Sequence, residues 1–142
     1  MNLEPLTVAG RLDEVTQLMD YVAWAAAAAG LGEQATYRLC LAVDEIATNI
    51  VTYAYDEAGR EGDLTVWATT GEDDLRITLR DGGDPFDPRA IAPPADLHKP
   101  PDQRRNGGLG IFLAMWGVDE FLYERDGDQN QSTFVVNLTA KP

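Results

Sequence analysis

The stretch DLTVWATTGEDDLRITLRDGGDPFDP, residues 63–88, decides the fold, because a hairpin of two strands can be read directly from it. Apolar and polar residues alternate in its first two thirds, and the polar run TGED, residues 70–73, separates two such segments. Alternation with a period of two is typical of strands that bury one face. The buried face of this β-hairpin is predicted to consist of Leu64, Val66, Ala68, Leu75, Ile77 and Leu79.

Two helices are predicted before the hairpin, because apolar residues recur there every three or four positions. The first begins at about Leu12, and Gly30 is placed to end it. The second runs from about Glu33 to the break at Gly59. Its apolar stripe is predicted to be Leu39, Val43, Ile46, Ile50 and Tyr53. Residues 3–8 are expected to add an edge strand.

The segment after the hairpin is predicted to be a long ordered loop, with a lid at about residues 88–106, because prolines interrupt it and no periodicity is present. A short helix is expected at IFLAMW, residues 111–116, and a final strand pair at residues 118–123 and 133–138, joined by DGDQN, residues 126–130. This order of elements predicts one α+β domain over residues 1–142, a two-layer sandwich with helices on one face of a mostly antiparallel sheet.

Charge and composition exclude several classes of function. The chain has 24 acidic and 11 basic residues, so its net charge of -13 disfavours direct binding to nucleic acid. A signal peptide is not recognisable, and the alanine run at residues 25–29 is too short to span a membrane. We therefore expect a cytoplasmic protein that does not bind membranes.

Glu45 and Asn49 are the first candidates for chemistry. They are four residues apart in the second predicted helix, so both side chains project from one face. An amide oxygen is a hard ligand that suits Mg²⁺, and a carboxylate one turn away can accept a proton. The same spacing also arises on solvated helix faces that have no function, so the pair alone does not decide between these interpretations.

DGGDPFDP, residues 81–88, follows the second strand of the hairpin directly. Asp81 can accept a hydrogen bond from an exocyclic amine, and Gly82 and Gly83 permit close approach of a ligand. The alternative is a glycine-rich turn capped by the aspartate side chain. Phe86 is expected to belong to the core.

RRNGGLG, residues 104–110, leads into the short predicted helix. Glycines before a helix let backbone N–H groups approach phosphate oxygens, and the start of a helix favours an anion. Arg104 and Arg105 can add charge-assisted contacts to a terminal phosphate. The alternative is a solvated basic pair on a loop.

In this order the three motifs resemble those of the GHKL (histidine-kinase-like) ATPase superfamily. LAVDEIATNIVTYAY, residues 41–55, resembles its N box, DGGDPFD, residues 81–87, its D-x-G-x-x-F-D box, and GGLGIFLAMW, residues 107–116, its later glycine box. Within the superfamily the chain is most similar to stand-alone anti-sigma-factor serine kinases of the RsbW and SpoIIAB type. The resemblance implies the Bergerat ATP-binding fold with ATP and Mg²⁺ as ligands.

The resemblance also implies roles for individual residues. Asn49 would be the Mg²⁺ ligand and Glu45 the general base. Asp81 would contact adenine, Gly83 would let the base approach, and Thr133 would close the adenine pocket. Residues serving the phosphates and the lid would be Arg105, Gly108, Leu109 and Gly110.

The function that the resemblance implies is ATP-dependent phosphorylation of a serine or threonine on an anti-anti-sigma (antagonist) protein, with a sigma factor as a second partner. Related kinases suggest a homodimer by analogy. One alternative is a non-catalytic regulator, in which ATP orders the lid and changes partner affinity without phosphoryl transfer. Another is an interaction domain without nucleotide binding, which the joint presence of Glu45, Asn49, Asp81 and the glycines disfavours.

Overall fold

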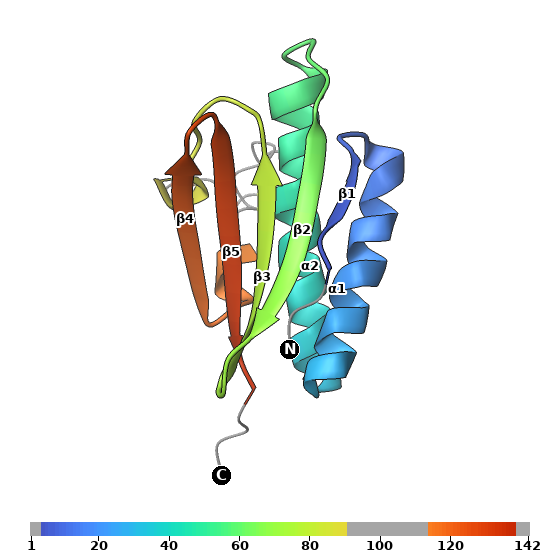
Figure 1. Cartoon of the computed structure of the whole chain (residues 1–142), viewed down its shortest axis with the longest axis vertical. Helices are drawn as coiled ribbons and strands as arrows, with labels where there is room; N and C mark the ends of the chain where they lie inside the picture. The colour runs from blue at the N-terminus through green and yellow to red at the C-terminus, as the bar shows by residue number, and fades with distance from the viewer. Residues whose placement is uncertain (1–3, 91–113, 139–142) are drawn as a thin grey trace, which may run out of the picture.

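The computed structural model describes residues 4–90 and 114–138, and these residues form an α+β sandwich of two layers (Figure 1). One layer is a 5-stranded sheet in the order β1-β2-β3-β5-β4, with antiparallel neighbours throughout. The other layer is the helix pair α1 and α2, which packs on one face of the sheet (Figure 1). The strands are β1 Leu6–Ala9, β2 Asp63–Thr70, β3 Asp74–Asp81, β4 Glu120–Asp126 and β5 Gln129–Asn137. The predicted fold class is therefore confirmed.

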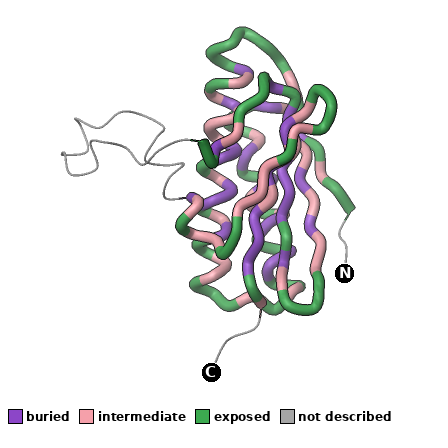
Figure 2. The backbone as a smooth tube through the Cα atoms, turned by 90° about the vertical axis from the view of Figure 1, so that its left-hand side faces the viewer, coloured by how far each residue is buried: buried purple, intermediate pink, exposed green. Residues whose placement is uncertain are grey.

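The β2–β3 hairpin follows the predicted alternation. Its register pairs Leu64 with Asp81 at one end and Thr70 with Leu75 at the other. All the side chains predicted for its inner face are buried against the helices, where they form the core together with Phe134 of β5. Figure 2 shows the buried positions gathered between the two layers. The pairing of β2 with β3 therefore extends to Asp81 and positions the start of the loop that follows it.

Helix α1, Val15–Ala29, follows a short 3-10 turn at Leu12–Glu14. It ends at Gly30, as predicted, because Gly30 adopts the left-handed conformation with φ of 80° that residues with a β-carbon rarely take. Its inner face lies on the sheet and against α2.

The second helix departs from the prediction in its last part. Regular α2, Glu33–Asn49, continues as a π-helix, η2, over Ile50–Asp56. A π-helix has wider turns than an α-helix, so the positions that face the core shift along the sequence. Val51 and Tyr55 are buried, whereas Tyr53 is 46% exposed. The assignment of Tyr53 to the apolar stripe was therefore wrong, and Ile50 is only partly buried.

The C-terminal strand pair is confirmed, but its connection is shorter than DGDQN. Only Gly127 and Asp128 lie between β4 and β5, and Gly127 has a left-handed φ of 62°. Because the turn is this tight, Asn130 belongs to β5 and lies opposite Asp81 of β3. The extent of the predicted loop was thus wrong at both ends, because Asp126 belongs to β4 and Gln129 and Asn130 belong to β5.

Several predicted features lie outside the described residues. These are Leu3, most of the lid, and the first half of the short helix, of which residues 114–116 are described and helical. A 3-10 turn at Pro88–Ala90 occupies the described start of the lid. Within the described ranges, none of the helices has the length and apolar character needed to cross a membrane.

Candidate functional site

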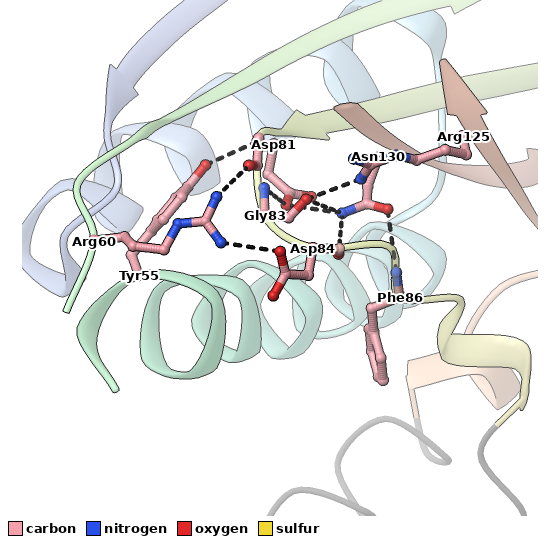
Figure 3. Close-up of polar contacts among 9 residues, drawn as sticks. Tyr55, Arg60, Asp81, Gly83, Asp84, Phe86, Arg125 and Asn130 are labelled. Atoms are coloured by element: carbon pink, nitrogen blue, oxygen red, sulfur yellow. Dashed lines mark hydrogen bonds and ion pairs between the residues drawn. The ribbon is translucent and has the colours of Figure 1, made fainter. Parts of the chain in front are cut away.

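The loop of residues 81–86 forms the centre of the candidate site, at the end of β3 (Figure 3). Asp81 is 4% exposed, and its Oδ2 atom accepts hydrogen bonds from Gly83 N at 2.9 Å and Asn130 Nδ2 at 3.2 Å. The bond from Gly83 N to the Asp81 side chain forms the aspartate-capped turn that was the alternative interpretation of this segment. Among the described residues, Asp81 Oδ1 has no hydrogen-bond partner. The loop therefore presents a buried carboxylate oxygen as an acceptor.

The electrostatics of Asp81 are set by opposing effects. Burial raises the pKa of its carboxyl group, because the charged form loses hydration. The Gly83 N–H group, the Asn130 amide and the positive charge of Arg125 act against that rise in the pKa. The described residues include no ion pair to Asp81. Neutral hydrogen-bond donors are thus the nearest groups that favour its ionised form.

Gly83 has a structural reason for lacking a side chain. A β-carbon at this position would lie 2.7 Å from Ala54 Cβ and 3.0 Å from Asp81 Oδ2. The absence of that carbon lets the loop lie against η2, the helical segment that continues the helix carrying Asn49. The predicted role of Gly83, close approach of an adenine base, stays a prediction beside this packing role.

Tyr55 supports the loop from the side of the helix. Its hydroxyl donates to Asp63 O at 2.9 Å and accepts from Gly82 N at 3.0 Å. The Tyr55 ring fits against Gly10 and Gly62, where added β-carbons would lie 2.4 Å from ring atoms. The π-helical stretch thus turns Tyr55 inward, to a position from which it fixes the backbone next to Asp81.

Asn130 supports the loop from the side of the sheet. Its Nδ2 atom donates to Asp81 and also to Asp84 O at 2.9 Å, and its Oδ1 atom accepts from Phe86 N at 3.3 Å. Arg125 of β4 adds a bond from Nη1 to Gly83 O at 2.9 Å. Asn130 was not among the predicted site residues, because it lies in a polar run that is predicted to be a loop. A shorter turn around Gly127 was the signal that would have placed it in a strand.

Asn49 and Glu45 lie on the solvent-facing side of the end of α2. Asn49 Nδ2 donates to Glu45 O at 2.7 Å, and Asn49 Oδ1 has no partner in the described part of the chain. The Glu45 side chain is exposed and makes no ion pair there either. The described residues therefore leave one amide oxygen and one carboxylate without a partner, and these groups suit a ligand.

A magnesium ion would fit this arrangement only if a bound phosphate group and water supplied further oxygen ligands. The described residues contain no cluster of three or more metal-binding His, Cys, Asp and Glu side chains. Mg²⁺ is commonly held by one or two protein oxygens together with phosphate oxygens and water. Asn49 Oδ1 suits that mode of binding.

Thr133 lies on the opposite face of the sheet from Asp81. Its hydroxyl is 3.0 Å from that of Thr78, its partner in the β3–β5 register. Neighbouring residues of a strand point to opposite faces, so Ser132, which is buried, shares the inner face with Asp81 and Asn130. The predicted role of Thr133 in the adenine pocket stays a prediction, and Ser132 is the neighbour that shares a face with Asp81.

Phe86 and the candidate phosphate-binding residues are the remaining predictions. Phe86 is 49% exposed and its ring points away from the hydrogen-bonded group, so its assignment to the core was wrong (Figure 3). The candidate phosphate-binding residues lie outside the described residues. They are Arg104, Arg105, Gly108, Leu109 and Gly110.

Comparison with known proteins connects this geometry to a family. The family model described as histidine kinase-like ATPase domain matches residues 8–136. Curated relatives include the serine-protein kinase RsbW of Staphylococcus aureus strains MSSA476 and MRSA252, each 35% identical over 91 residues, or 61% of this chain. The aligned part spans 57% of the length of these relatives.

Solved structures share the fold. The RsbU and RsbW domains of a Mycobacterium tuberculosis protein match with a TM-score of 0.64 at 15% identity, over 98% of this chain and 34% of that one. The histidine kinase domain of a blue-light activated histidine kinase from Erythrobacter litoralis matches with a TM-score of 0.52 at 17% identity, over 89% of this chain and 60% of that one. At such low identity the likeness establishes the architecture alone.

Proposed function

The chain belongs to the histidine kinase-like ATPase domain family, and from this premise we propose that it binds Mg-ATP and phosphorylates a serine or threonine of an anti-anti-sigma protein. The observation that carries the proposal is the buried Asp81 carboxylate, which has one oxygen without a partner in the described chain. Its loop meets Ala54 of η2, the segment that continues the helix of Glu45 and Asn49. The serine-protein kinases among its relatives support the class of substrate.

Asp81 is suited to recognise adenine. An ionised carboxylate only accepts hydrogen bonds, so Oδ1 can take one from the exocyclic amine of adenine. A purine with a carbonyl oxygen in place of that amine would set two acceptors against each other, which is unfavourable in a buried site. The loop therefore favours ATP over nucleotides whose purine carries an oxo group there.

Asn49 and Glu45 are suited to the phosphate end. When bound, Mg²⁺ would offset the negative charge of the phosphates, and Asn49 Oδ1 would be its protein ligand. Glu45 would accept the proton of the incoming serine or threonine hydroxyl. The hydroxyl oxygen forms its new bond to the γ-phosphorus, the bond from that phosphorus to the bridging oxygen breaks, and ADP leaves with the electron pair.

The likeness to RsbW serine-protein kinases supports the proposed partners. We expect the chain to phosphorylate an anti-anti-sigma protein and to sequester a sigma factor when that protein is phosphorylated. A non-catalytic regulator of the same fold would bind the same nucleotide and the same partners but would transfer no phosphate. The two functions differ only in the fate of the γ-phosphate.

Nucleotide binding is tested by titrating Mg-ATP against the wild-type chain and Asn49→Ala, with and without EDTA. We expect Asn49→Ala to weaken Mg-ATP binding about tenfold or more, as loss of a charge-assisted contact would. Its affinity for ATP in EDTA should equal that of wild type. Gln34→Ala is the matched control, because it removes an amide side chain from an exposed position of the same helix. Absence of wild-type binding, or equal Mg-ATP affinity in all three proteins, contradicts the proposed site.

Phosphoryl transfer is tested with ATP radiolabelled at the γ-phosphate and the anti-anti-sigma proteins of the source organism. We expect label on one serine or threonine, located by mass spectrometry. Glu45→Gln should keep ATP affinity and slow transfer by about 10²–10⁴-fold, the usual contribution of a general base. Glu33→Gln, at the start of the same helix, should transfer at the wild-type rate. ATP binding without transfer to any of these proteins would refute the kinase and leave the non-catalytic regulator.

A further inference from the structure

We propose that Asn130 is the positioning residue that orients the Asp81 carboxylate and thereby makes the site select an amino purine over an oxo purine. The inference rests on the proposed nucleotide binding. Asn130 lies at the second position of β5, directly opposite Asp81 in the β3–β5 register. It is 4% exposed, so its side chain is committed to the protein interior.

The contacts of Asp81 explain how orientation is imposed. A carboxylate can turn about the bond to its β-carbon, and a single hydrogen bond restrains that turn weakly. Here Gly83 N and Asn130 Nδ2 approach the same oxygen, Oδ2, from two different segments of the chain. Oδ2 is therefore occupied, and Oδ1 is the atom left for a ligand.

The contacts of Asn130 explain why its own amide cannot turn over. Within the described residues, the partners of Nδ2 are all acceptors: the Asp81 carboxylate, Gly83 O at 3.4 Å and Asp84 O at 2.9 Å. Oδ1 accepts from the Phe86 N–H group and the Tyr123 hydroxyl. A flipped amide would place its oxygen against these acceptors and its N–H₂ group against the Phe86 N–H group. The amide N–H₂ group is thus held toward Asp81.

This arrangement determines the chemistry that Asp81 offers. Burial pushes the carboxyl pKa up, and the Asn130 bond is one of the contacts that oppose the shift. An ionised Asp81 accepts only and matches an exocyclic amine, whereas a protonated Asp81 donates and matches a carbonyl oxygen. Without Asn130 the carboxyl group would turn more freely and take up a proton at higher pH. Loss of Asn130 should therefore weaken the preference for an amine.

The test measures ATP and ITP affinity side by side, since inosine carries a carbonyl oxygen where adenosine carries its amine. Binding is measured at about pH 6 and about pH 8 for wild type, Asn130→Ala and the control Asn137→Ala. Asn137 is exposed at the end of the same strand, and its hydrogen bond to Asp119 uses the backbone N–H group, which alanine keeps. Wild type and the control should prefer ATP at both pH values.

Asn130→Ala should lose about tenfold in ATP affinity, as expected for one bond to a charged group, and lose less for ITP. The ratio of its ATP affinity to its ITP affinity should fall further at the lower pH. Tyr123→Phe keeps Asn130 but removes a donor that orients the amide, so it should change the preference in the same direction by a smaller factor. Thermal melts establish that each variant is folded, and Tyr123→Phe decides the question if Asn130→Ala does not fold.

An ATP-to-ITP ratio that stays at the wild-type value in the folded variants would overturn the inference and leave Asn130 a purely structural residue. Failure of the wild-type chain to bind either nucleotide would instead overturn the proposed function, and the inference with it. The two failures are therefore distinguishable in one set of titrations.

Discussion

The loop of residues 81–86 and the helix face of Glu45 and Asn49 are proposed to meet opposite ends of one nucleotide, and they are built differently. The loop is tied on one side to Tyr55 and on the other to Asn130. The helix face offers side-chain atoms with no partner in the described residues, apart from the bond of the Asn49 amide to its own helix. One region is fixed by long-range contacts, and the other is left open.

The difference suggests a division of labour. A base of fixed shape is recognised best by donors and acceptors that are already in place, because little ordering is then needed on binding. Phosphates, a metal ion and a protein hydroxyl change their positions during transfer, so side chains that can adjust suit them better. We expect substitutions in the loop to change stability or selectivity, and those on the helix face to change turnover.

Of the substitutions that test this difference, Asp81→Asn is expected to have the largest effect, because it removes the charge of the side chain and keeps its shape. The amide oxygen can still accept from Gly83 and Asn130, but the amide N–H₂ group then faces the ligand amine. ATP affinity should fall about tenfold to a hundredfold, since a hydrogen bond to a charged group contributes about 1.5–3 kcal/mol. Calorimetric titration measures it, and an unchanged affinity would show that the loop does not recognise the base.

The same variant should carry a pH signature in stability. Burial raises the pKa of Asp81 in the native state, so between the ordinary and the raised pKa the native state binds more protons than the unfolded state. The free energy of unfolding therefore falls as pH rises through that window. Asp81→Asn should lack this fall, and urea denaturation from about pH 4 to about pH 8 compares the two proteins.

A second, smaller effect is expected from Gly83→Ala, which tests how closely the loop meets the helix. The added methyl group would meet Ala54 Cβ at 2.7 Å. Overpacking of this kind costs about 1–3 kcal/mol of stability. Combining it with Ala54→Gly should restore part of the loss, so the double mutant should be more stable than the two single changes would predict if they were additive. Additive losses would show that the loop and the helix do not press on each other.

The smallest effect is expected from Asp84→Ala, which removes the ion pair with Arg60 at 3.1 Å. The Asp84 side chain is 89% exposed, and the Asp84 carbonyl that receives the Asn130 bond is unchanged. Exposed pairs contribute about 0.2–1 kcal/mol, and salt weakens them further. Thermal melts at low and high salt check this, and a larger, salt-independent loss would mean that the Asp84 side chain holds the loop.

Much of the fold could be predicted from the sequence, because local patterns determine it. The alternation of the β2–β3 hairpin and the glycine that ends α1 both act over a few residues. The inward position of Tyr55 could not be predicted in this way. It depends on the space left by Gly62 and by Gly10, of which Gly10 is distant in the sequence, because neither has a side chain that would fill it. Only the assembled fold shows why the last turns of the helix widen.

The site was predictable in part for the same reason. Asp81 ends β3 and Gly83 comes two residues later, so their order in the sequence already places them next to each other. Asn130 joins them only through the register between β3 and β5, and a one-residue difference in that register exchanges the two faces of the strand. The same effect separates Ser132 from Thr133. The local sequence identifies which kinds of residue belong to the site. Which residues of β5 point to the inner face of the sheet depends on the length of the turn before that strand.

The strand order of the sheet also bears on how the chain behaves at high concentration. In the described part of the chain, β1 and β4 are the outer strands, and outer strands have backbone groups that could pair with another molecule (Figure 1). β1 spans only Leu6–Ala9, and β4 carries Glu120, Glu124, Arg125 and Asp126. Short length and charge both oppose the growth of intermolecular sheets. The sheet is thus a poor template for aggregation.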